Sequence, residues 1–554
     1  MVKRIFSFLP ELAALALAAA LRAPGLGEAT LTASETRIWM FAGDSWGHLL
    51  RLFRLAADPN TGTFFPYVWF LKLWLRWGDS EAWLRLPSLL AGMIAVVMVY
   101  FFARRVFGRW AGVIAAILFA AAPYNVAASR TVSATSIGVA LFVIGLYLFY
   151  LIFEGDRRPV IIASFAAVTL VGVNFGFHAA LLILPMNVLF FGFAKDRMKS
   201  IWWWIPLNLA LIGCALYWEP RWAATFFVKP PTWESARNQS IYGFIPKESI
   251  AYLQLRLLFI EKYFKILFTL GGFYFNSLLV NGWSFLGVII LVVSYHYFPF
   301  LGFREYEGGY RPRVFAFITL ALTLALAGLF SMTQLQLWEV LLPAAAVLYA
   351  VAAHGAVKHT GWRGKTLLAL MILSMVLGFV PMQRAEEKSR PDWREAAAFL
   401  ESDPERLSPI VLIDGGEDTL PLFYYGRPFL SRLVSLMPDI DLKIIGKDKF
   451  RQDEFLPVIK GTVDTRPPEG IMNLFKLYPR VWIVKKGAGL PEKPRWAREY
   501  AIWLQKFAVV VKEKKIEGGL RIENRRAKDK PADDKQIDGD IYLQLYELRG
   551  LNPN

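Results

Sequence analysis

The stretch LRLPSLLAGMIAVVMVYFFA, residues 84–103, decides the fold of this chain. It is long enough to cross a bilayer as a helix, since a span needs about 20 apolar residues, and its only charged residue is Arg85. Lipid offers no hydrogen-bond partner to a peptide group, so a helix that satisfies its own backbone is the default spanning structure. We therefore predict a membrane-spanning helix here.

Comparable apolar segments recur along the first two thirds of the chain. By apolar length and pattern we predict about eleven spans, near residues 5–22, 84–103, 109–127, 131–153, 159–174, 177–194, 200–218, 278–300, 314–331, 337–355 and 365–381. The break around Asn174–His178 leaves open whether the two segments beside it form one long kinked span.

Composition agrees with a polytopic membrane protein. Of the 554 residues, 55% are hydrophobic, and the mean hydropathy is +0.38. The net charge is +17, but the basic residues are spread over many loops rather than forming one stripe, which argues against a nucleic-acid partner. The single cysteine, Cys214, excludes an intrachain disulfide and a multi-cysteine zinc site.

The distribution of charge in the loops predicts the topology. Lys and Arg gather in alternate short loops, and the loops between these are nearly uncharged or long. Cytoplasmic loops carry the excess of Lys and Arg, so the N-terminus is predicted to be cytoplasmic, in the cell (inner) membrane. An odd number of spans places the C-terminal part outside the cytoplasm, whereas an even number would reverse that placement.

The spans leave two long outer loops and a polar tail. Residues 1–382 are predicted to form a transmembrane domain, in which loops 25–83 and 219–277 carry amphipathic helices lying on the membrane. From residue 383 to 554, short apolar strands such as 409–414 and 480–486 alternate with helical runs, one of them following Pro391. This alternation predicts a soluble, extracytoplasmic α/β domain.

Several motifs, taken in order, resemble one family. They are Ala20-Leu21-Arg22, WGDSEAWLRLPSLLAG (77–92), RRVFGRWAGVIAAILFAAAPYNVAASR (104–130), Phe177-His178, QLQLWEVLLPAAAVLYAVAAHG (334–355), and PDWREAAAFL, PLFYYGRP and RVWIV in the tail. The chain resembles the GT-C glycosyltransferases that use a polyprenyl-phosphate sugar, which include protein O-mannosyltransferases and lipid A aminoarabinose transferases. The resemblance covers most of the chain and implies a GT-C-like fold.

The resemblance also implies a catalytic acid in the first outer loop. An acidic pair acts there in the family, and its positions correspond to Ser34 and Glu35, so the second acid is kept. A carboxylate near the acceptor can take its proton, which makes Glu35 the candidate base. The alternative is a capping box, Thr32-Ala33-Ser34-Glu35, in which Glu35 only closes a helix start. Asp44, further along the same predicted helix, could replace the lost acid or simply lie on its solvated face.

Four further residues are candidates for binding the donor and its phosphate. Arg22 and Arg130 fall at the outer ends of spans, where they could bind a phosphate or reach to lipid headgroups. His178 and Glu339 are ionisable groups at membrane depth, which marks a functional site by default. The alternative for His178 is an interhelical hydrogen bond.

Three other positions depart from the family pattern. A His-Pro-Pro element falls on Thr63-Phe64-Phe65, an acidic residue on Thr131, and an Arg-Tyr pair on Leu337-Trp338.

These observations predict a membrane glycosyltransferase. It would be an inverting hexosyl- or pentosyltransferase that moves a sugar from a polyprenyl-phosphate donor to a lipid, glycan or protein acceptor on the outer face. The alternative is a catalytically degenerate relative that binds lipid-linked sugar or serves in assembly, and a transporter is a third, weaker reading. We identify no metal ligands in the sequence and predict no cofactor, although a bound divalent ion stays open.

Overall fold

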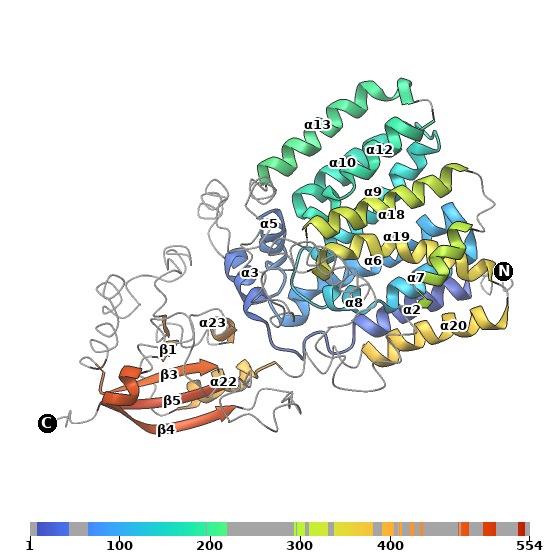
Figure 1. Cartoon of the computed structure of the whole chain (residues 1–554). Coiled ribbons are helices and arrows are strands. Elements are labelled where there is room, and N and C mark those ends of the chain that lie inside the picture. The colour runs from blue at the N-terminus through green and yellow to red at the C-terminus, as the bar shows by residue number, and fades with distance from the viewer. Residues whose placement is uncertain are drawn as a thin grey trace, which may run out of the picture. The chain divides into compact units, whose positions relative to one another are not determined.

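The structure is a computed structural model of the whole chain (Figure 1). It describes residues 8–43, 65–195, 197–218, 293–294, 296–304, 310–330, 337–359, 361–379, 390–403, 408, 410–412, 421–425, 433–435, 475, 478–486, 502–516 and 541–548.

The chain divides into two compact units. One, called here the helical unit, consists of Met1–Pro24, Asp58–Tyr67 and Arg85–Gln383. The other, called the sheet unit, consists of Gly25–Ala57, Val68–Leu84 and Arg384–Asn554. The sheet unit therefore combines two pieces of the first outer loop with the whole polar tail.

Apolar helices build the helical unit. They are α2 (Leu9–Arg22), α6 (Glu81–Phe107, of which the first turn belongs to the sheet unit), α7 (Arg109–Ala121), α8 (Pro123–Ser129), α9 (Thr135–Phe153), α10 (Pro159–Phe175), α11 (Phe177–Ala180), α12 (Ile183–Phe193), α13 (Ile201–Trp218), α18 (Tyr310–Phe330), α19 (Leu337–Lys358) and α20 (Trp362–Leu373), which continues as the π-helical turn η2 (Ser374–Phe379). These helices coincide with the apolar segments of the sequence.

The helices pack closely where small residues face a neighbour. A Cβ atom added at Gly172 of α10 would lie 2.7 Å from the Cβ of Ala179 in α11, so only glycine allows this approach. The helix breaks between α10 and α11 at Gly176, within the Asn174–His178 segment. Whether the segments beside the break cross the membrane as one kinked span or as two stays a prediction. In the core of the unit, Phe165 and Trp204 stack on each other, Phe149 contacts both rings at a tilt, and all three side chains are fully buried.

Among the described residues, three helices are long and apolar enough to cross a membrane: Glu81–Phe107, Thr135–Phe153 and Leu341–Lys358. The pair formed by α7 and α8 is bent by 64° and would make a fourth if it is one broken span. The helical, membrane-spanning character of the fold is thus borne out. The total of about eleven spans stays a prediction.

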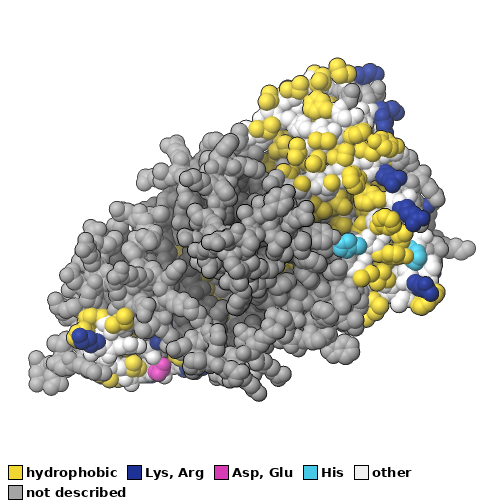
Figure 2. Space-filling model, viewed as in Figure 1, with side chains coloured by type: hydrophobic (Ala, Val, Ile, Leu, Met, Phe, Trp, Pro, Cys, Tyr) yellow, Lys and Arg dark blue, Asp and Glu magenta, His cyan; other side chains and the backbone are white. Residues whose placement is uncertain are grey.

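Charged side chains gather at one end of the helices. Figure 2 shows hydrophobic side chains over the visible face of the helical unit and Lys and Arg along one edge of it. At this end Glu11 of α2 forms a bidentate ion pair with Arg109 of α7, at 2.9 and 3.1 Å. Arg157 donates to the carbonyl of Lys195 at 3.0 Å, and this bond joins the loop after α9 to the loop after α12. The basic end agrees with the predicted cytoplasmic loops.

In the described part of the sheet unit, five strands form a mixed sheet in the order β2-β1-β3-β5-β4. Its strands are β1 (Ile410–Leu412), β2 (Leu433–Ser435), β3 (Arg480–Lys486), β4 (Ala508–Ile516) and β5 (Ile541–Leu548). β1 runs parallel to β2 and β3, whereas β5 runs antiparallel to β3 and β4. The predicted strands at 409–414 and 480–486 are confirmed as β1 and β3, and the sequence analysis missed β2.

Helix α22 (Trp393–Ser402) supplies the core beneath the sheet. Asp392 caps it, because its carboxylate accepts from the backbone N–H groups of Arg394 and Glu395 at 3.0 and 3.2 Å. The apolar face of α22 buries Trp393, Ala396, Ala397 and Leu400 against the strands and against Leu422 of α23 (Pro421–Tyr425). Ala33 and Met40 of the helix α3 (Ala33–Gly43), which lies within the first outer loop, pack against the same core, so this part of the loop belongs to it.

Trp393 is 2% exposed, and its loss would open a large cavity in this core. We expect Trp393→Ala to lower the free energy of unfolding of the sheet unit by about 3–5 kcal/mol. Thermal denaturation of the full chain in detergent would measure the change. Val509→Ala, on the exposed side of β4, is the matched control. Equal shifts for the two variants would contradict the buried placement of Trp393.

Candidate functional site

In the first outer loop, a capping box forms the start of α3 (Ala33–Gly43). The backbone N–H of Thr32 donates to Oε2 of Glu35 at 2.9 Å, and the N–H of Glu35 donates back to the Thr32 hydroxyl at 3.2 Å. These reciprocal bonds satisfy two N–H groups that the first turn of a helix leaves unpaired. The capping role considered for Glu35 is therefore present. It does not exclude a chemical role for the same carboxylate.

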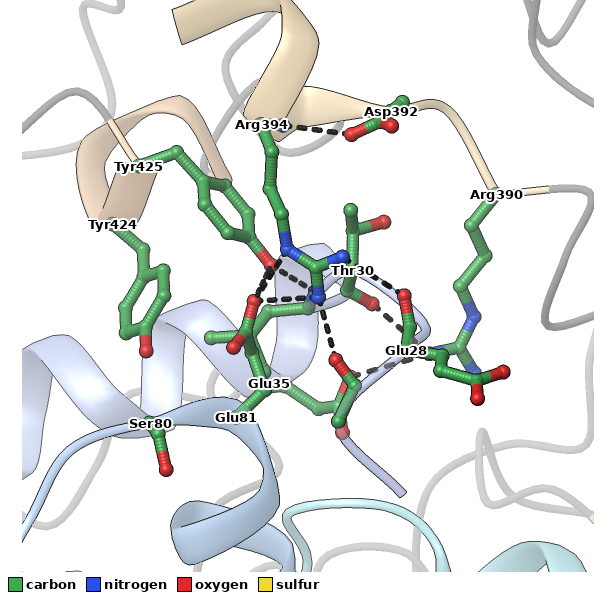
Figure 3. A network of polar contacts seen from close by, with 12 residues as sticks. Glu28, Thr30, Glu35, Ser80, Glu81, Arg390, Asp392, Arg394, Tyr424 and Tyr425 are labelled. Atoms are coloured by element: carbon green, nitrogen blue, oxygen red, sulfur yellow. Dashed lines mark hydrogen bonds and ion pairs between the residues drawn. The ribbon is translucent and has the colours of Figure 1, made fainter. Parts of the chain in front are cut away.

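Glu35 is buried, at 2% exposure, and contacts the tail. Nη1 of Arg390 lies 3.5 Å from its Oε2. The same guanidinium nitrogen donates to the carbonyl of Thr30 at 3.2 Å, and the Thr30 hydroxyl donates to the carbonyl of Pro391 at 3.0 Å. The loop before α3 and the segment before α22 are thus joined by reciprocal polar contacts (Figure 3).

A second carboxylate of the sheet unit, that of Glu81, belongs to the network in Figure 3. Its Oε1 receives Nε of Arg394 at 2.8 Å and Nη2 at 2.7 Å. The phenol of Tyr425 donates to the same oxygen at 3.0 Å. Glu81 begins α6, so this one oxygen connects the start of α6 with α22 and α23.

Arg394 and the tyrosines also reach back to the outer loop. Arg394 donates to the carbonyls of Gly27 and Glu28 at 2.7 and 3.0 Å. The phenol oxygen of Tyr425 accepts from the N–H of Leu31 at 2.8 Å, and the phenol of Tyr424 donates to the carbonyl of Asp79. Three segments that lie far apart in the sequence therefore share one hydrogen-bonded network.

This network shifts the ionisation of its members. Burial raises the pKa of the Tyr425 phenol above its usual value, and the charge and hydrogen bond of Glu81 act in the same direction. Burial lowers the pKa of the Arg394 guanidinium, but the hydrogen bond and charge of Glu81 outweigh burial and raise it overall. Both shifts favour a neutral phenol and a charged guanidinium around Glu81.

The helical unit holds the two predicted arginines together. Arg22, the last residue of α2, is fully buried and donates to the Ser129 hydroxyl at 3.3 Å and to the carbonyls of Ala18 and Ala120 at 3.1 and 2.9 Å. Arg130 donates to the carbonyls of Arg22 and Pro24, both at 2.7 Å. Among the described residues, Nη2 of Arg22 has no hydrogen-bond partner. A buried cation with an unused donor has spare capacity for an anion.

His178 lies at another helix contact of the same unit. It belongs to α11 and is buried, and a Cβ atom added at Gly138 of α9 would lie 2.7 Å from its Nδ1. The imidazole therefore packs directly on the backbone of α9. The interhelical hydrogen bond considered for His178 stays a prediction. Glu339 belongs to α19, and Asp44 lies outside the described residues.

Two positions that depart from the family pattern have contacts in the described part of the chain. The hydroxyl of Ser34, which stands in place of the first acid, lies 3.0 Å from the Thr32 hydroxyl, and the other such position is Thr131. Its hydroxyl donates to the carbonyl of Ala128 at 3.2 Å, which closes the turn after α8. Residues 63 and 64 lie outside the described residues, and Leu337-Trp338 form the start of α19. Within the described ranges no group of three or more His, Cys, Asp or Glu side chains could hold a metal ion.

Sequence reasoning missed the basic residues of the tail that reach the outer loop. Arg390 and Arg394 flank the cap residue Asp392, and the sequence there predicts only a helix that follows Pro391. The only sequence signal near these arginines is the spacing of basic and aromatic residues around Pro391-Asp392-Trp393. This spacing indicates the start of a helix, but it does not identify the residues that Arg390 and Arg394 contact.

Comparison with known proteins supports the resemblance. Residues 65–218 match the profile of the family described as dolichyl-phosphate-mannose-protein mannosyltransferase. The structure of ArnT from Cupriavidus metallidurans in the apo state is 13% identical, with a TM-score of 0.57 and 98% of each chain covered. The same enzyme bound to undecaprenyl phosphate is 16% identical, with a TM-score of 0.55 over 97% of this chain and 98% of that one. A search of curated proteins finds no match.

These matches agree with the resemblance that the motifs carry. The likeness to the two ArnT structures extends over nearly the whole chain and shows a shared fold. The profile match adds sequence similarity from α5 (Phe65–Trp74) to α13.

The raised pKa of Tyr425 predicts a pH-dependent contribution to stability. In the unfolded chain the phenol ionises near pH ~10, whereas in the fold it stays neutral at that pH. The stabilisation by Tyr425 is therefore complete below pH ~10 and is lost as the pH rises toward the folded pKa. We expect Tyr425→Phe to cost about 1–3 kcal/mol at neutral pH, because Glu81 and the Leu31 N–H lose a partner.

Thermal denaturation from about pH 8 to about pH 11 tests this linkage. The difference in midpoint between the parent protein and Tyr425→Phe should shrink at the alkaline end. Tyr310→Phe, which removes an exposed phenol, provides the control. A difference that is constant with pH would show that the Tyr425 phenol ionises equally in the folded and unfolded chain.

Proposed function

We propose that this chain, which shares the fold of the GT-C glycosyltransferases, is a membrane glycosyltransferase that uses a polyprenyl-phosphate sugar. It transfers the sugar to a lipid, glycan or protein acceptor at the outer face of the cell (inner) membrane. The observation that carries the proposal is the match of residues 65–218 to a mannosyltransferase family profile within a fold shared over nearly the whole chain. The ArnT structure bound to undecaprenyl phosphate supports a prenyl-phosphate donor.

Arg22 and Arg130 are assigned to the donor phosphate. Arg22 is buried at the end of α2, and its Nη2 has no partner within the described residues. A guanidinium binds phosphate oxygens through charge-assisted hydrogen bonds, which are stronger than neutral ones. A buried cation is costly unless it is compensated, so an anion arriving here would gain more than one at an exposed arginine.

Glu35 is assigned to the acceptor as general base. Its carboxylate takes the proton of the acceptor hydroxyl or amine as that atom attacks the anomeric carbon. The bond between the anomeric carbon and the phosphate oxygen breaks, and its electron pair leaves with the polyprenyl phosphate. One displacement of this kind inverts the anomeric configuration. The capping bonds of Glu35 hold the carboxylate in a fixed orientation, which such a step requires.

The remaining candidates complete this proposal. His178 and Glu339 are proposed to contact the donor, and Asp44 to assist at the acceptor in place of the acid absent at position 34. The chain is proposed to have about eleven spans and a cytoplasmic N-terminus. A transmembrane domain, residues 1–382, would be followed by an extracytoplasmic α/β domain, residues 383–554. A divalent ion bound by the substrates stays compatible with this arrangement.

The burial of Glu35 gives the degenerate alternative a specific basis. A carboxylate at 2% exposure that closes a capping box and contacts Arg390 could serve the fold alone. In that case the protein binds lipid-linked sugar without turnover. Product formation by the purified chain would eliminate this alternative.

Substitution of Glu35 separates the two functions. Glu35→Gln keeps the shape of the side chain but cannot accept the acceptor's proton. We expect transfer in proteoliposomes containing polyprenyl-phosphate sugars to fall by about 100-fold or more, since positioned general bases contribute about 10²–10⁴-fold. Glu28→Gln, an exposed acid in the same loop, should retain transfer. Unchanged transfer in Glu35→Gln would remove Glu35 from the mechanism.

The assignment of Arg22 predicts a change in donor binding. We expect Arg22→Gln to raise the KM for the donor by about 10-fold or more, because a charge-assisted bond to phosphate contributes about 1.5–3 kcal/mol. Arg105→Gln, at the exposed end of α6, should leave the donor KM unchanged. The denaturation midpoint of each variant shows whether the bundle is intact. An unchanged donor KM in intact Arg22→Gln would leave Arg22 only its bonds to Ser129 and Ala120.

A further inference from the structure

The segment before α22 touches the first outer loop at the position of the proposed base. Arg390 donates to the Thr30 carbonyl at 3.2 Å and lies 3.5 Å from Oε2 of Glu35, and Thr30 donates to the Pro391 carbonyl at 3.0 Å. All of these residues belong to the sheet unit. The contact joins positions 355 residues apart in the sequence, so it exists only in the folded chain.

The contact between Arg390 and Glu35 matters because the Glu35 carboxylate is buried. Oε2 of Glu35 receives the Thr32 N–H at 2.9 Å and the Thr32 hydroxyl at 3.2 Å, both neutral donors. The carboxylate is 2% exposed, so bulk water contributes little to solvating its charge. A buried carboxylate is costly to charge unless it is hydrogen-bonded and paired with a cation. Arg390 supplies a cation beside Oε2, and its own side chain is about one quarter exposed, at 23%.

We infer that Arg390 is a positioning residue for Glu35, which holds the carboxylate charged and correctly oriented for the transfer step. This inference rests on the proposed function, because it gives Arg390 a role through Glu35. The tail thereby becomes a part of the catalytic apparatus without touching either substrate. The two substrates are those proposed above, and Arg390 contacts neither of them.

Arg394 offers a matched comparison within the same segment. It is four residues away, also an arginine, and also paired with a carboxylate of the outer loop region, but that carboxylate is Glu81. Loss of Arg394 removes a better ion pair than loss of Arg390, with N–O distances of 2.7 and 3.5 Å respectively. A purely structural role of this segment therefore predicts that Arg394 is the more sensitive position. A positioning role of Arg390 predicts the opposite for turnover.

The first experiment measures the contact independently of activity. Denaturation midpoints of the full chain in detergent are compared for Arg390→Gln, Glu35→Gln and the double variant, and for Arg394→Gln with and without Glu35→Gln. Side chains in contact give non-additive changes, whereas independent ones add. We expect the 390/35 pair to be non-additive and the 394/35 pair to be closer to additive. Additive changes for 390/35 would overturn the inference.

The second experiment measures transfer kinetics in proteoliposomes with a polyprenyl-phosphate sugar. We expect Arg390→Gln to lower kcat by about 10- to 100-fold, the cost of a misplaced catalytic group, while both KM values change by less than about 3-fold. Arg390→Lys, which keeps the charge, should recover most of the lost kcat. Arg394→Gln should lower the denaturation midpoint more than it lowers kcat.

The outcomes separate this inference from the proposed function. Coupling between 390 and 35 with a selective fall in kcat supports both. Transfer by the parent protein that Arg390→Gln leaves unchanged overturns the inference and keeps the function. No transfer by the parent protein with any prenyl-phosphate sugar overturns the proposed function and with it the positioning role, even if the coupling is present.

Discussion

The ion pair between Glu81 and Arg394 is the interaction on which the sheet unit depends. One carboxylate oxygen accepts from two nitrogens of Arg394 and from the phenol of Tyr425. The donors come from α22 and α23, and the acceptor from the first turn of α6. The unit is assembled from two pieces of the outer loop and the tail, so directional contacts are needed to fix how these segments are oriented. A charge-assisted network supplies that direction, whereas apolar packing alone does not.

The two units solve the problem of polar groups in different ways. In the helical unit, helices satisfy their own backbone, and the few polar side chains tie helix ends together. Arg22 and Arg130 do so through carbonyl oxygens, and Glu11 and Arg109 through an ion pair at the basic end. In the sheet unit, strands pair with one another and side chains join the loops. Glu35, Arg22 and Arg130 lie at or beside helix ends, where the backbone leaves polar groups for side chains to pair with.

Part of this arrangement followed from local patterns in the sequence. The apolar segments predicted the helices, because a run of apolar residues as long as a bilayer has few other stable structures. The capping box at Thr32 and Glu35 and the cap at Asp392 were also predictable, since their partners lie within three residues. Strand β2 (Leu433–Ser435) was missed. The contacts of Arg390 and Arg394 were missed because their partners lie more than 300 residues away.

The sequence by itself determined that this chain is a helical membrane protein with a polar tail, and it singled out Glu35, Arg22, Arg130 and His178. Hydrophobic length and short-range hydrogen bonds carry that information, and both can be read in a window of a few residues. Only the tertiary structure decided that the first outer loop and the tail form one unit, with Arg390 beside Glu35 and Arg394 on Glu81. The sequence shows which residues carry opposite charges and could pair. Only the packing of the folded chain brings one of these possible partners within bonding distance.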